Sequence, residues 1–322
     1  MTTLAFVAGM DSSRRHQAPP PSVLGDLVSS MRSMSPEVTA VITTHGRPEV
    51  VCDAIASVQA EVHQSIEVIV VDDGGTFVAP PVDTDVELRV VRGSELGVAR
   101  ARNLGLEHAR GEFVIYLDDD DIALPNRISA LLSVARQQGA SLCFGMTRRV
   151  VDGSAVVLED VPTQQMTSGA VGFCDLLTCT PHVNAVLVRT ETLRAVGGFD
   201  AGIEHFDDWA AWLRVADRVD VMWRVEETVA EWRVHTHGLS GKVHQAGLMK
   251  RRILSLFEKI QASLSNENAQ AIAAARRVVD LTDIQTYDDY VNAMATARDG
   301  LHGGGTCFGR PLAWHSRHSV RP

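Results

Sequence analysis

The 322-residue sequence lacks the features that mark a membrane-spanning, disulfide-framed or nucleic-acid-binding protein. No apolar run approaches the roughly 18 residues of a membrane span. The five cysteines are odd in number and form no CxxC pair, so we expect reduced thiols and a cytoplasmic location rather than a disulfide frame or a zinc site. The net charge of −10 provides no basic field, and we therefore expect no nucleic-acid partner.

No GxGxxG motif follows a candidate strand, which excludes a dinucleotide-binding dehydrogenase at the level of motifs. What the sequence does contain is a short apolar run, Phe113 to Leu117, that leads directly into the four carboxylates Asp118 to Asp121. The run is typical of a strand buried on both faces. Four adjacent acids repel one another, so positive charge is expected beside them. Such oxygen ligands suit Mg²⁺ or Mn²⁺, and a solvated acidic turn is the alternative.

Strand-like and helix-like segments alternate through the first half of the chain. This pattern predicts an α/β fold: a doubly wound, mostly parallel sheet with helices on both faces. A second predicted strand also ends in acids, at Asp72 and Asp73, and the carboxyl ends of such strands share one edge where ligands bind. We expect strands at 38–44, 66–71, 88–91 and 113–117, and helices that begin near Pro48, Gly97 and Pro125.

Composition divides the chain into three parts. Residues 1–35 are rich in Pro, Ser and Arg and are expected to form a loose extension, residues 36–244 hold the α/β pattern, and residues 245–322 are expected to form a helical region with a flexible tail. One helix of this last part carries an apolar stripe flanked by basic residues. It could lie on an anionic membrane surface, as a peripheral anchor, or pack on the α/β domain or on a second copy of the chain in a homodimer. We favour packing, because no lipidation motif is present. The stripe consists of Met249, Ile253, Leu256, Phe257 and Ile260.

Five motifs follow one another between residues 36 and 240. They are Val41 to Pro48, Val70 to Gly74, Leu96 to Gly105, Tyr116 to Asp121, and Gly197 to Asp200 followed by Asp207-Asp208-Trp209. Together they resemble the family 2 glycosyltransferases, which have the GT-A fold and a DxD motif. Two positions depart from the family pattern: Thr-His-Gly stands after the first strand where Pro-Thr-Tyr-Asn is commoner, and Asp207 stands where Glu is usual.

The resemblance implies an enzyme that moves a sugar from a nucleotide-diphosphate sugar donor to an acceptor hydroxyl. The acceptor would be a glycan, a lipid-linked molecule or a small molecule. By resemblance Asp208 is the base that takes the hydroxyl proton, with Asp207 beside it. A single base without a second nucleophile facing the donor predicts one displacement and inversion at the anomeric carbon.

The resemblance also implies a divalent metal site. Alternate residues at a strand end point the same way, so Asp118 and Asp120 are able to face one ligand. By resemblance Asp120 binds the metal, which would be Mg²⁺ or Mn²⁺, and Asp118 lies nearer the ribose. His235 resembles the position that completes the coordination, although it and His237 would also be ordinary as surface histidines.

The remaining donor-site residues are assigned by resemblance. Arg102 would pair with the diphosphate or with Asp118, and a solvated helix arginine is the alternative. Asp119 would face away, towards a helix end or an arginine. The nucleotide would be held by Thr44, His45 and Arg47 in the first turn, by Asp73 on the base, and by Asp72 in framing that pocket.

Two other functions remain open at this point. A nucleotidyltransferase that acts on sugar phosphates also pairs this kind of sheet with acidic metal sites. It is expected to carry a Gly-rich, Lys-bearing loop after the first strand, whereas this turn has one Gly and no Lys. A catalytically inactive sugar-nucleotide-binding protein is the third candidate, and the presence of all the acids that the chemistry needs argues against it.

Overall fold

The computed structural model describes residues 35–61, 65–75, 77–79, 86–151, 157–158, 168–234 and 248–301. From Pro36 onward these residues belong to one compact unit. Most of the expected N-terminal extension, and the tail after residue 301, lie outside the described residues. The expected boundary at residue 244 stays a prediction.

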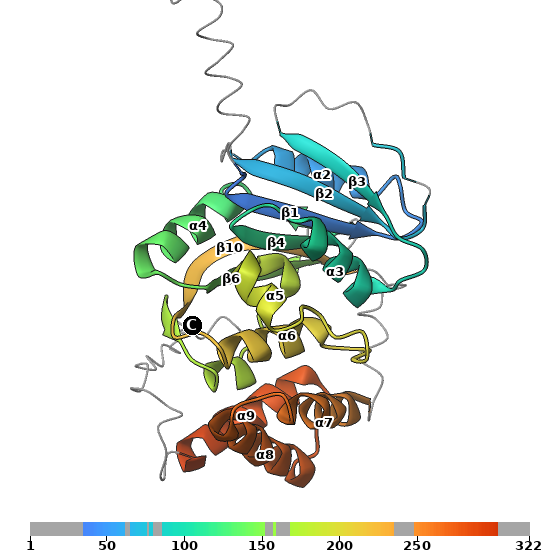
Figure 1. Cartoon of the computed structure of the whole chain (residues 1–322). Helices are drawn as coiled ribbons and strands as arrows, with labels where there is room; N and C mark the ends of the chain where they lie inside the picture. Colours follow the sequence, from blue (N-terminus) through green and yellow to red (C-terminus); the bar gives the residue numbers. More distant parts are fainter. Residues whose placement is uncertain are drawn as a thin grey trace, which may run out of the picture. The chain divides into compact units, whose positions relative to one another are not determined.

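Ten strands of the described residues form one sheet, with the central order β3-β2-β1-β4-β9-β6-β10-β5 (Figure 1). Strands β3, β2, β1 and β4 pair in parallel, and β9 runs antiparallel to both β4 and β6. Strand β6 therefore points the same way as β4, and β10 pairs in parallel with β6. The predicted doubly wound, mostly parallel sheet is confirmed. The strands are β1 (Val38–Thr44), β2 (Ile66–Asp72), β3 (Glu87–Arg92), β4 (Phe113–Asp118), β5 (Ile122–Ala123), β6 (Leu142–Val151), β7 (Val157–Leu158), β8 (Gly169–Val171), β9 (Val186–Arg189) and β10 (Met222–Val234).

Every residue of β1 and β2 is buried, because helices cover both faces of the sheet. Neighbouring residues of a strand face opposite layers. Ile42 and Val70 belong to the core shared with α2 and α4, whereas Val41 and Ile69 belong to the core shared with α3 and α6. Burial of one such side chain contributes about 1.5–3 kcal/mol, so two buried faces explain the continuous apolar run of each strand. The helices are α2 (Val51–Gln59), α3 (Val98–His108), α4 (Arg127–Gln138), α5 (Thr190–Ala195), α6 (Asp207–Ala216), α7 (Leu248–Gln261), α8 (Asn266–Leu281) and α9 (Tyr287–Leu301), with short 3-10 helices η2 (Asp175–Leu177) and η3 (Val183–Ala185).

Helix α3 lies close against β1 because Gly105 has no side chain. A Cβ atom at Gly105 would lie 2.3 Å from Cγ1 of Val41. This close approach brings the first turns of α3, with Arg102, towards the carboxyl ends of the strands. Gly105, the last residue of the third of the five motifs, therefore has a packing role.

Helices α7, α8 and α9 pack beside α6 (Figure 1). The apolar stripe of α7 is fully buried, so the favoured prediction of packing is confirmed, and of the two packing partners left open the α/β domain is the one contacted. The indole of Trp209 on α6 lies 5.6 Å from the ring of Phe257 and 5.4 Å from the ring of Tyr290. Neither a second copy of the chain nor a membrane is needed to cover the stripe. Helix α9 lies within the predicted C-terminal helical region, although its bounds were not predicted.

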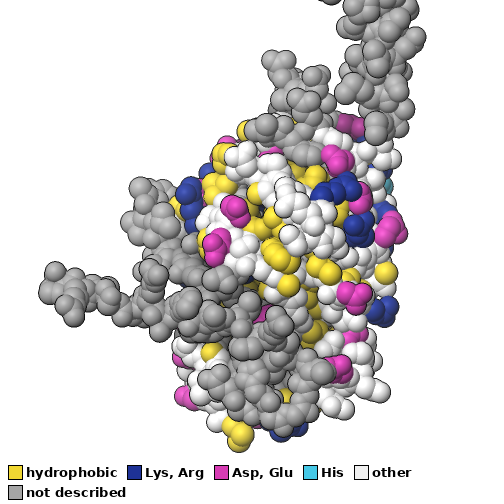
Figure 2. All heavy atoms as spheres, turned by 90° about the vertical axis from the view of Figure 1, so that its left-hand side faces the viewer, with side chains coloured by type: hydrophobic (Ala, Val, Ile, Leu, Met, Phe, Trp, Pro, Cys, Tyr) yellow, Lys and Arg dark blue, Asp and Glu magenta, His cyan; other side chains and the backbone are white. Residues whose placement is uncertain are grey.

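The described surface exposes few large apolar side chains, chiefly Val78 and Leu281. Figure 2 shows one face of the molecule, on which acidic and basic side chains lie among hydrophobic and uncharged ones. Among the described residues, no helix is both long enough and apolar enough to span a bilayer. Of the cysteines in this part of the chain, Cys52, Cys143 and Cys179 are free thiols.

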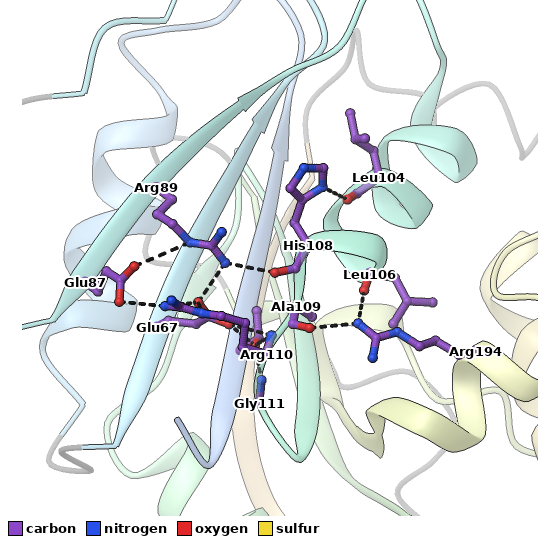
Figure 3. A network of polar contacts seen from close by, with 11 residues as sticks. Glu67, Glu87, Arg89, Leu104, Leu106, His108, Ala109, Arg110, Gly111 and Arg194 are labelled. Atoms are coloured by element: carbon purple, nitrogen blue, oxygen red, sulfur yellow. Dashed lines mark hydrogen bonds and ion pairs between the residues drawn. The ribbon is translucent and has the colours of Figure 1, made fainter. Parts of the chain in front are cut away.

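A buried carboxylate organises the amino-terminal end of the sheet (Figure 3). Glu67 on β2 is 1% exposed, and it accepts hydrogen bonds from Thr39 Oγ1 at 2.6 Å, from the Arg110 backbone N–H at 2.7 Å and from Arg89 at 2.8 Å. Burial acts to raise the pKa of Glu67, but these hydrogen bonds outweigh burial and lower it. The network joins β1, β2, β3 and the loop after α3 at the end of the sheet away from the acidic strand ends.

We expect Glu67→Gln to lower the free energy of unfolding at pH 7 by about 2 kcal/mol, because the hydrogen-bonded charge is lost while the side-chain volume is kept. The folded-state pKa of Glu67 is lowered, so its stabilisation is present above the unfolded pKa and is lost as the pH falls through the folded value. Urea denaturation at pH 7 and in the acid range should therefore show a difference that shrinks with acidification.

Glu87→Gln is the matched control, since Glu87 contacts Arg110 in the same network but is 52% exposed. We expect it to cost less than about 0.5 kcal/mol. Equal effects of the two substitutions would contradict the assigned role of Glu67.

Candidate active site

A pocket of about 710 Å³ lies at the carboxyl ends of β1, β2 and β4. The first turns of α3 and α6, the segment that leads into η3 and the end of β10 complete its wall. The turns after β1 and β2 meet closely, because a Cβ atom at Gly74 would lie 2.6 Å from the backbone nitrogen of Gly46. The acidic strand ends predicted from the sequence are thus brought to one edge of the sheet.

The first two of the four carboxylates have different partners. Asp118 accepts a hydrogen bond from Arg102 at 2.8 Å, and the guanidinium lowers the pKa of Asp118 against the opposing effect of burial. Asp119 is 1% exposed and accepts from Thr44 Oγ1 at 2.6 Å and from Arg47. Burial raises the pKa of Asp119 to about 6, although Thr44 and Arg47 act to lower it. Asp119 contacts an arginine, one of its two expected partners, but it lines the pocket instead of facing away from it.

The other two carboxylates also have different partners. Asp120 is 18% exposed and binds Arg47 at 2.7 Å. Asp121 is buried, and it accepts hydrogen bonds from the Arg233 backbone N–H at 2.7 Å and from the side chain of Asn184. Burial, followed by the charges of Asp118 and Asp120, raises the pKa of Asp121. Of the four carboxylates, Asp118 (27% exposed) and Asp120 (18% exposed) are the least buried.

Arg102 joins the two acidic groups of the pocket. Its guanidinium contacts Asp118 at 2.8 Å and Asp207 at 2.9 Å, and its side chain is 7% exposed. A planar guanidinium with several N–H donors suits such a bridge. Of the roles that the sequence left open for Arg102, pairing with Asp118 is what this structure contains, and a solvated helix arginine is excluded.

Asp207 and Asp208 open α6 and line the pocket. Asp207 is occupied by Arg102, whereas Asp208 accepts only the N–H of Trp209, at 2.8 Å, among the hydrogen bonds of the described residues. Burial, and then the charge of Asp207, raises the pKa of Asp208 to about 7. Phe206 before them has a left-handed backbone with φ of 66°, a costly conformation for a non-glycine residue that the surrounding packing must hold.

The residues assigned to the nucleotide occupy the turns after β1 and β2. Thr44, His45, Arg47 and Asp73 line the pocket, and Asp73 accepts hydrogen bonds from the N–H groups of Leu96 and Gly97 at 2.8 and 2.9 Å. Their roles towards a nucleotide stay predictions.

Asp72 takes a different place from its neighbour Asp73. It is fully buried beneath the turn, where it accepts from the N–H groups of Gly75 and Phe77 at 2.9 and 2.7 Å and from Arg92. These contacts make Asp72 a turn residue. Its predicted part in framing the base pocket would act through the shape of this turn.

His182 and Asn184 belong to the site although sequence reasoning passed over them. His182 lines the pocket and stacks on Trp232 with ring centroids 5.1 Å apart. Burial lowers the pKa of His182 to about 4, so the ring is neutral near pH 7. Asn184 is fully buried; its side chain accepts from the Asp118 N–H at 3.1 Å and donates to Asp121. The partners of these two residues are far away in the sequence, so only the folded structure shows that this turn belongs to the site.

Side chains of α6 and α9 hold the segment that leads to His182. The indole N–H of Trp209 donates to the Leu176 carbonyl at 2.8 Å, and that of Trp212 donates to the Pro181 carbonyl at 3.1 Å. The hydroxyl of Tyr287 donates to Thr180 Oγ1 at 2.7 Å. The C-terminal helices therefore support the wall of the pocket as well as α6.

The donor chemistry of the pocket fits a hard divalent cation. Asp118 and Asp120 both line it with carboxylate oxygens, which Mg²⁺ and Mn²⁺ prefer. Among the described residues, no group of three or more His, Cys, Asp or Glu side chains is arranged to hold a metal. The predicted third ligand, His235, lies outside the described residues, as does His237.

Residues 39–160 match the family model described as glycosyl transferase family 2. A protein of Rickettsia felis described as an uncharacterized glycosyltransferase is 25% identical over 187 residues, which cover 56% of this chain and 30% of that relative. This chain thus spans less than a third of that relative's length.

Two solved structures are similar in fold. One is the mannosyltransferase PcManGT of Pyrobaculum calidifontis in complex with GDP-Man and Mn²⁺, with a TM-score of 0.58, 16% identity, and coverage of 85% of this chain and 77% of that chain. The other is S. aureus TarS 1-349 in complex with UDP-GlcNAc, with a TM-score of 0.57, 13% identity, and coverage of 82% and 92%. Residues 39–160 are thus similar to the glycosyl transferase family 2, and the chain shares its GT-A fold with these two solved structures.

Proposed function

We propose that this protein transfers a sugar from a nucleotide-diphosphate sugar to an acceptor hydroxyl, with inversion and with the help of Mg²⁺ or Mn²⁺. The observation that carries the proposal is the meeting of Asp208, whose pKa is raised to about 7, with the strand-end carboxylates Asp118 and Asp120 in one pocket. A base with a pKa near the operating pH and a polyanion-binding edge are the two parts that this reaction needs.

The donor half of the pocket is built by the turns after β1 and β2 and by the end of β4. Thr44, Arg47 and Asp73 line it, and Arg47 is held by Asp119 and Asp120 within reach of a diphosphate. A guanidinium that already faces the pocket is suited to bind phosphate oxygens. Asp118 and Asp120 would hold the divalent cation, which neutralises charge on the departing diphosphate.

The acceptor half is formed by the start of α6. Asp208 accepts the proton of the acceptor hydroxyl as the hydroxyl oxygen bonds to the anomeric carbon. The bond from that carbon to the diphosphate oxygen breaks, and the nucleoside diphosphate leaves with the electron pair. Asp207 remains paired with Arg102 and keeps that guanidinium between the two halves. The acceptor itself stays a prediction: a glycan, lipid-linked or small-molecule hydroxyl.

The first test removes the proposed metal ligand. We expect Asp120→Ala to lower turnover of nucleotide sugar by about 10²-fold or more, because a bound metal contributes several kcal/mol to the transition state. EDTA should have a similar effect on the wild type, and added Mn²⁺ should reverse it. Turnover is measured as nucleoside diphosphate released from a panel of nucleotide sugars.

The control for this test is Asp220→Ala, which removes an exposed carboxylate that does not line the pocket. Circular dichroism should show that both variants are folded. Full activity in EDTA or in Asp120→Ala would refute the proposed metal dependence.

The second test is the pH profile. The base must be ionised, so we expect kcat/KM to fall as the pH drops through about 7, the value to which burial and Asp207 raise the pKa of Asp208. Asp207→Asn removes one raising charge and releases Arg102, so the acid limb of that variant should move to lower pH. An acid limb that stays in place would argue against Asp208 as the titrating base.

The third test concerns stereochemistry. Direct attack assisted by one base predicts a product with the opposite anomeric configuration to the donor sugar. The configuration is read from the coupling constant of the anomeric proton by NMR. A product that retains the donor configuration would rule out the single displacement.

A further inference from the structure

His182 is fixed at the edge of the proposed donor site. It stands directly before η3, and its ring stacks on the indole of Trp232 with an interplanar angle of 29°. The guanidinium of Arg149 lies 5.3 Å from the centre of the same indole. The imidazole therefore rests on a side chain that is itself held in place.

The contacts of His182 also define which ring nitrogen carries the proton. The backbone N–H of Asn184 donates to Nδ1 at 3.3 Å, so Nδ1 is an acceptor. In a neutral imidazole the proton then sits on Nε2. Nε2 has no hydrogen-bond partner among the residues that the structure describes, although His182 lines the pocket.

Asn184 couples this turn to the acidic strand end. Its side-chain oxygen accepts the N–H of Asp118 at 3.1 Å, and its side-chain nitrogen donates to Asp121. Asp118 is joined through Arg102 to Asp207, which is next to Asp208. His182, two residues before Asn184, therefore lines the same pocket as Asp118 and Asp208.

We propose that His182 is a specificity-determining residue that donates a hydrogen bond from Nε2 to a hydroxyl of the sugar in the nucleotide-sugar donor. The proposal rests on the proposed function, because the reacting sugar must lie between the diphosphate and the base. A neutral N–H donor suits a hydroxyl, whereas phosphate oxygens are better served by the cationic Arg47. The site therefore takes a sugar with a hydroxyl group directed at η3.

The test compares each nucleotide sugar with its own nucleoside diphosphate. Affinities for UDP and UDP-GlcNAc, and for GDP and GDP-mannose, are measured by calorimetry with Mn²⁺ on the full chain. His182→Phe keeps a ring to stack on Trp232 but removes the donor. We expect it to reduce the preference for the bound sugar nucleotide over its diphosphate by ~10-fold, the effect of about one hydrogen bond.

Two further variants separate recognition from structure. His182→Gln restores an N–H donor and should recover part of the preference. His108→Phe removes an exposed imidazole from α3 outside the pocket and should leave the preference unchanged. Since His182→Phe and His182→Gln both lose the Nδ1 contact to Asn184, a purely structural role would weaken both ligands alike and would leave the ratio intact.

The outcomes distinguish this inference from the function beneath it. A wild type that prefers a sugar nucleotide, with the same preference in His182→Phe, would overturn the role of His182 and leave the proposed function standing. A wild type that binds no member of the panel more tightly than its diphosphate would overturn the donor assignment, and the role of His182 with it.

Discussion

The separation of four adjacent carboxylates is the constraint on which the pocket depends. Two unit charges about 4 Å apart interact by roughly 4 kcal/mol at an effective dielectric constant of 20, so the run Asp118 to Asp121 folds only if its carboxylates find partners elsewhere in the chain. Arg102 comes from α3, Arg47 from the turn after β1, and the Arg233 N–H from the end of β10. Pairing the carboxylates of this one strand end therefore brings three distant segments to the same edge of the sheet.

Buried carboxylates lie at both ends of the sheet, but the balance between acidic and cationic side chains differs between the two ends. At the amino-terminal end the buried Glu67 is surrounded by Arg89 and Arg110, and the pKa of its carboxyl group is lowered, as expected for a stabilising contact. At the carboxyl-terminal end acids outnumber the cations that contact them. There the pKa of Asp119 is raised to about 6 and that of Asp208 to about 7, first by burial in both cases. An incompletely satisfied charge is costly for stability, and it is what binding a cation and accepting a proton require.

The sequence predicted what local pattern determines. Buried strands, the helices between them and the acids at their ends are readable because each leaves a periodic or contiguous signal. The pair Asp72 and Asp73 shows the limit: two adjacent identical side chains face different surroundings, one beneath its own turn and one towards the start of α3. His182 and Asn184 carry no periodic signal, since their partners are Trp232, Asp118 and Asp121. Helix α9 falls within the predicted C-terminal helical region and its core positions Tyr287, Tyr290, Val291 and Met294 recur at helical spacing, so its bounds could have been assigned from the sequence.

The C-terminal helices hold α6 in place through contacts at both of its ends. Asp217 at the end of α6 accepts hydrogen bonds from Ser265 and Asn268 at the start of α8, and Lys259 of α7 donates to the Gly202 carbonyl before α6 begins. Trp209, one residue after the proposed base, is packed between α7 and α9. The strand ends that would hold the donor all fall within residues 39–160, the segment that matches the family, whereas Asp208, α6 and its supporting helices lie beyond it. The strand-end part of the donor site is thus built from the segment that matches the family, whereas the base is positioned by packing outside that segment. We therefore expect the choice of acceptor to depend on residues 168–301, where side chains of α6 and α9 hold the wall of the pocket.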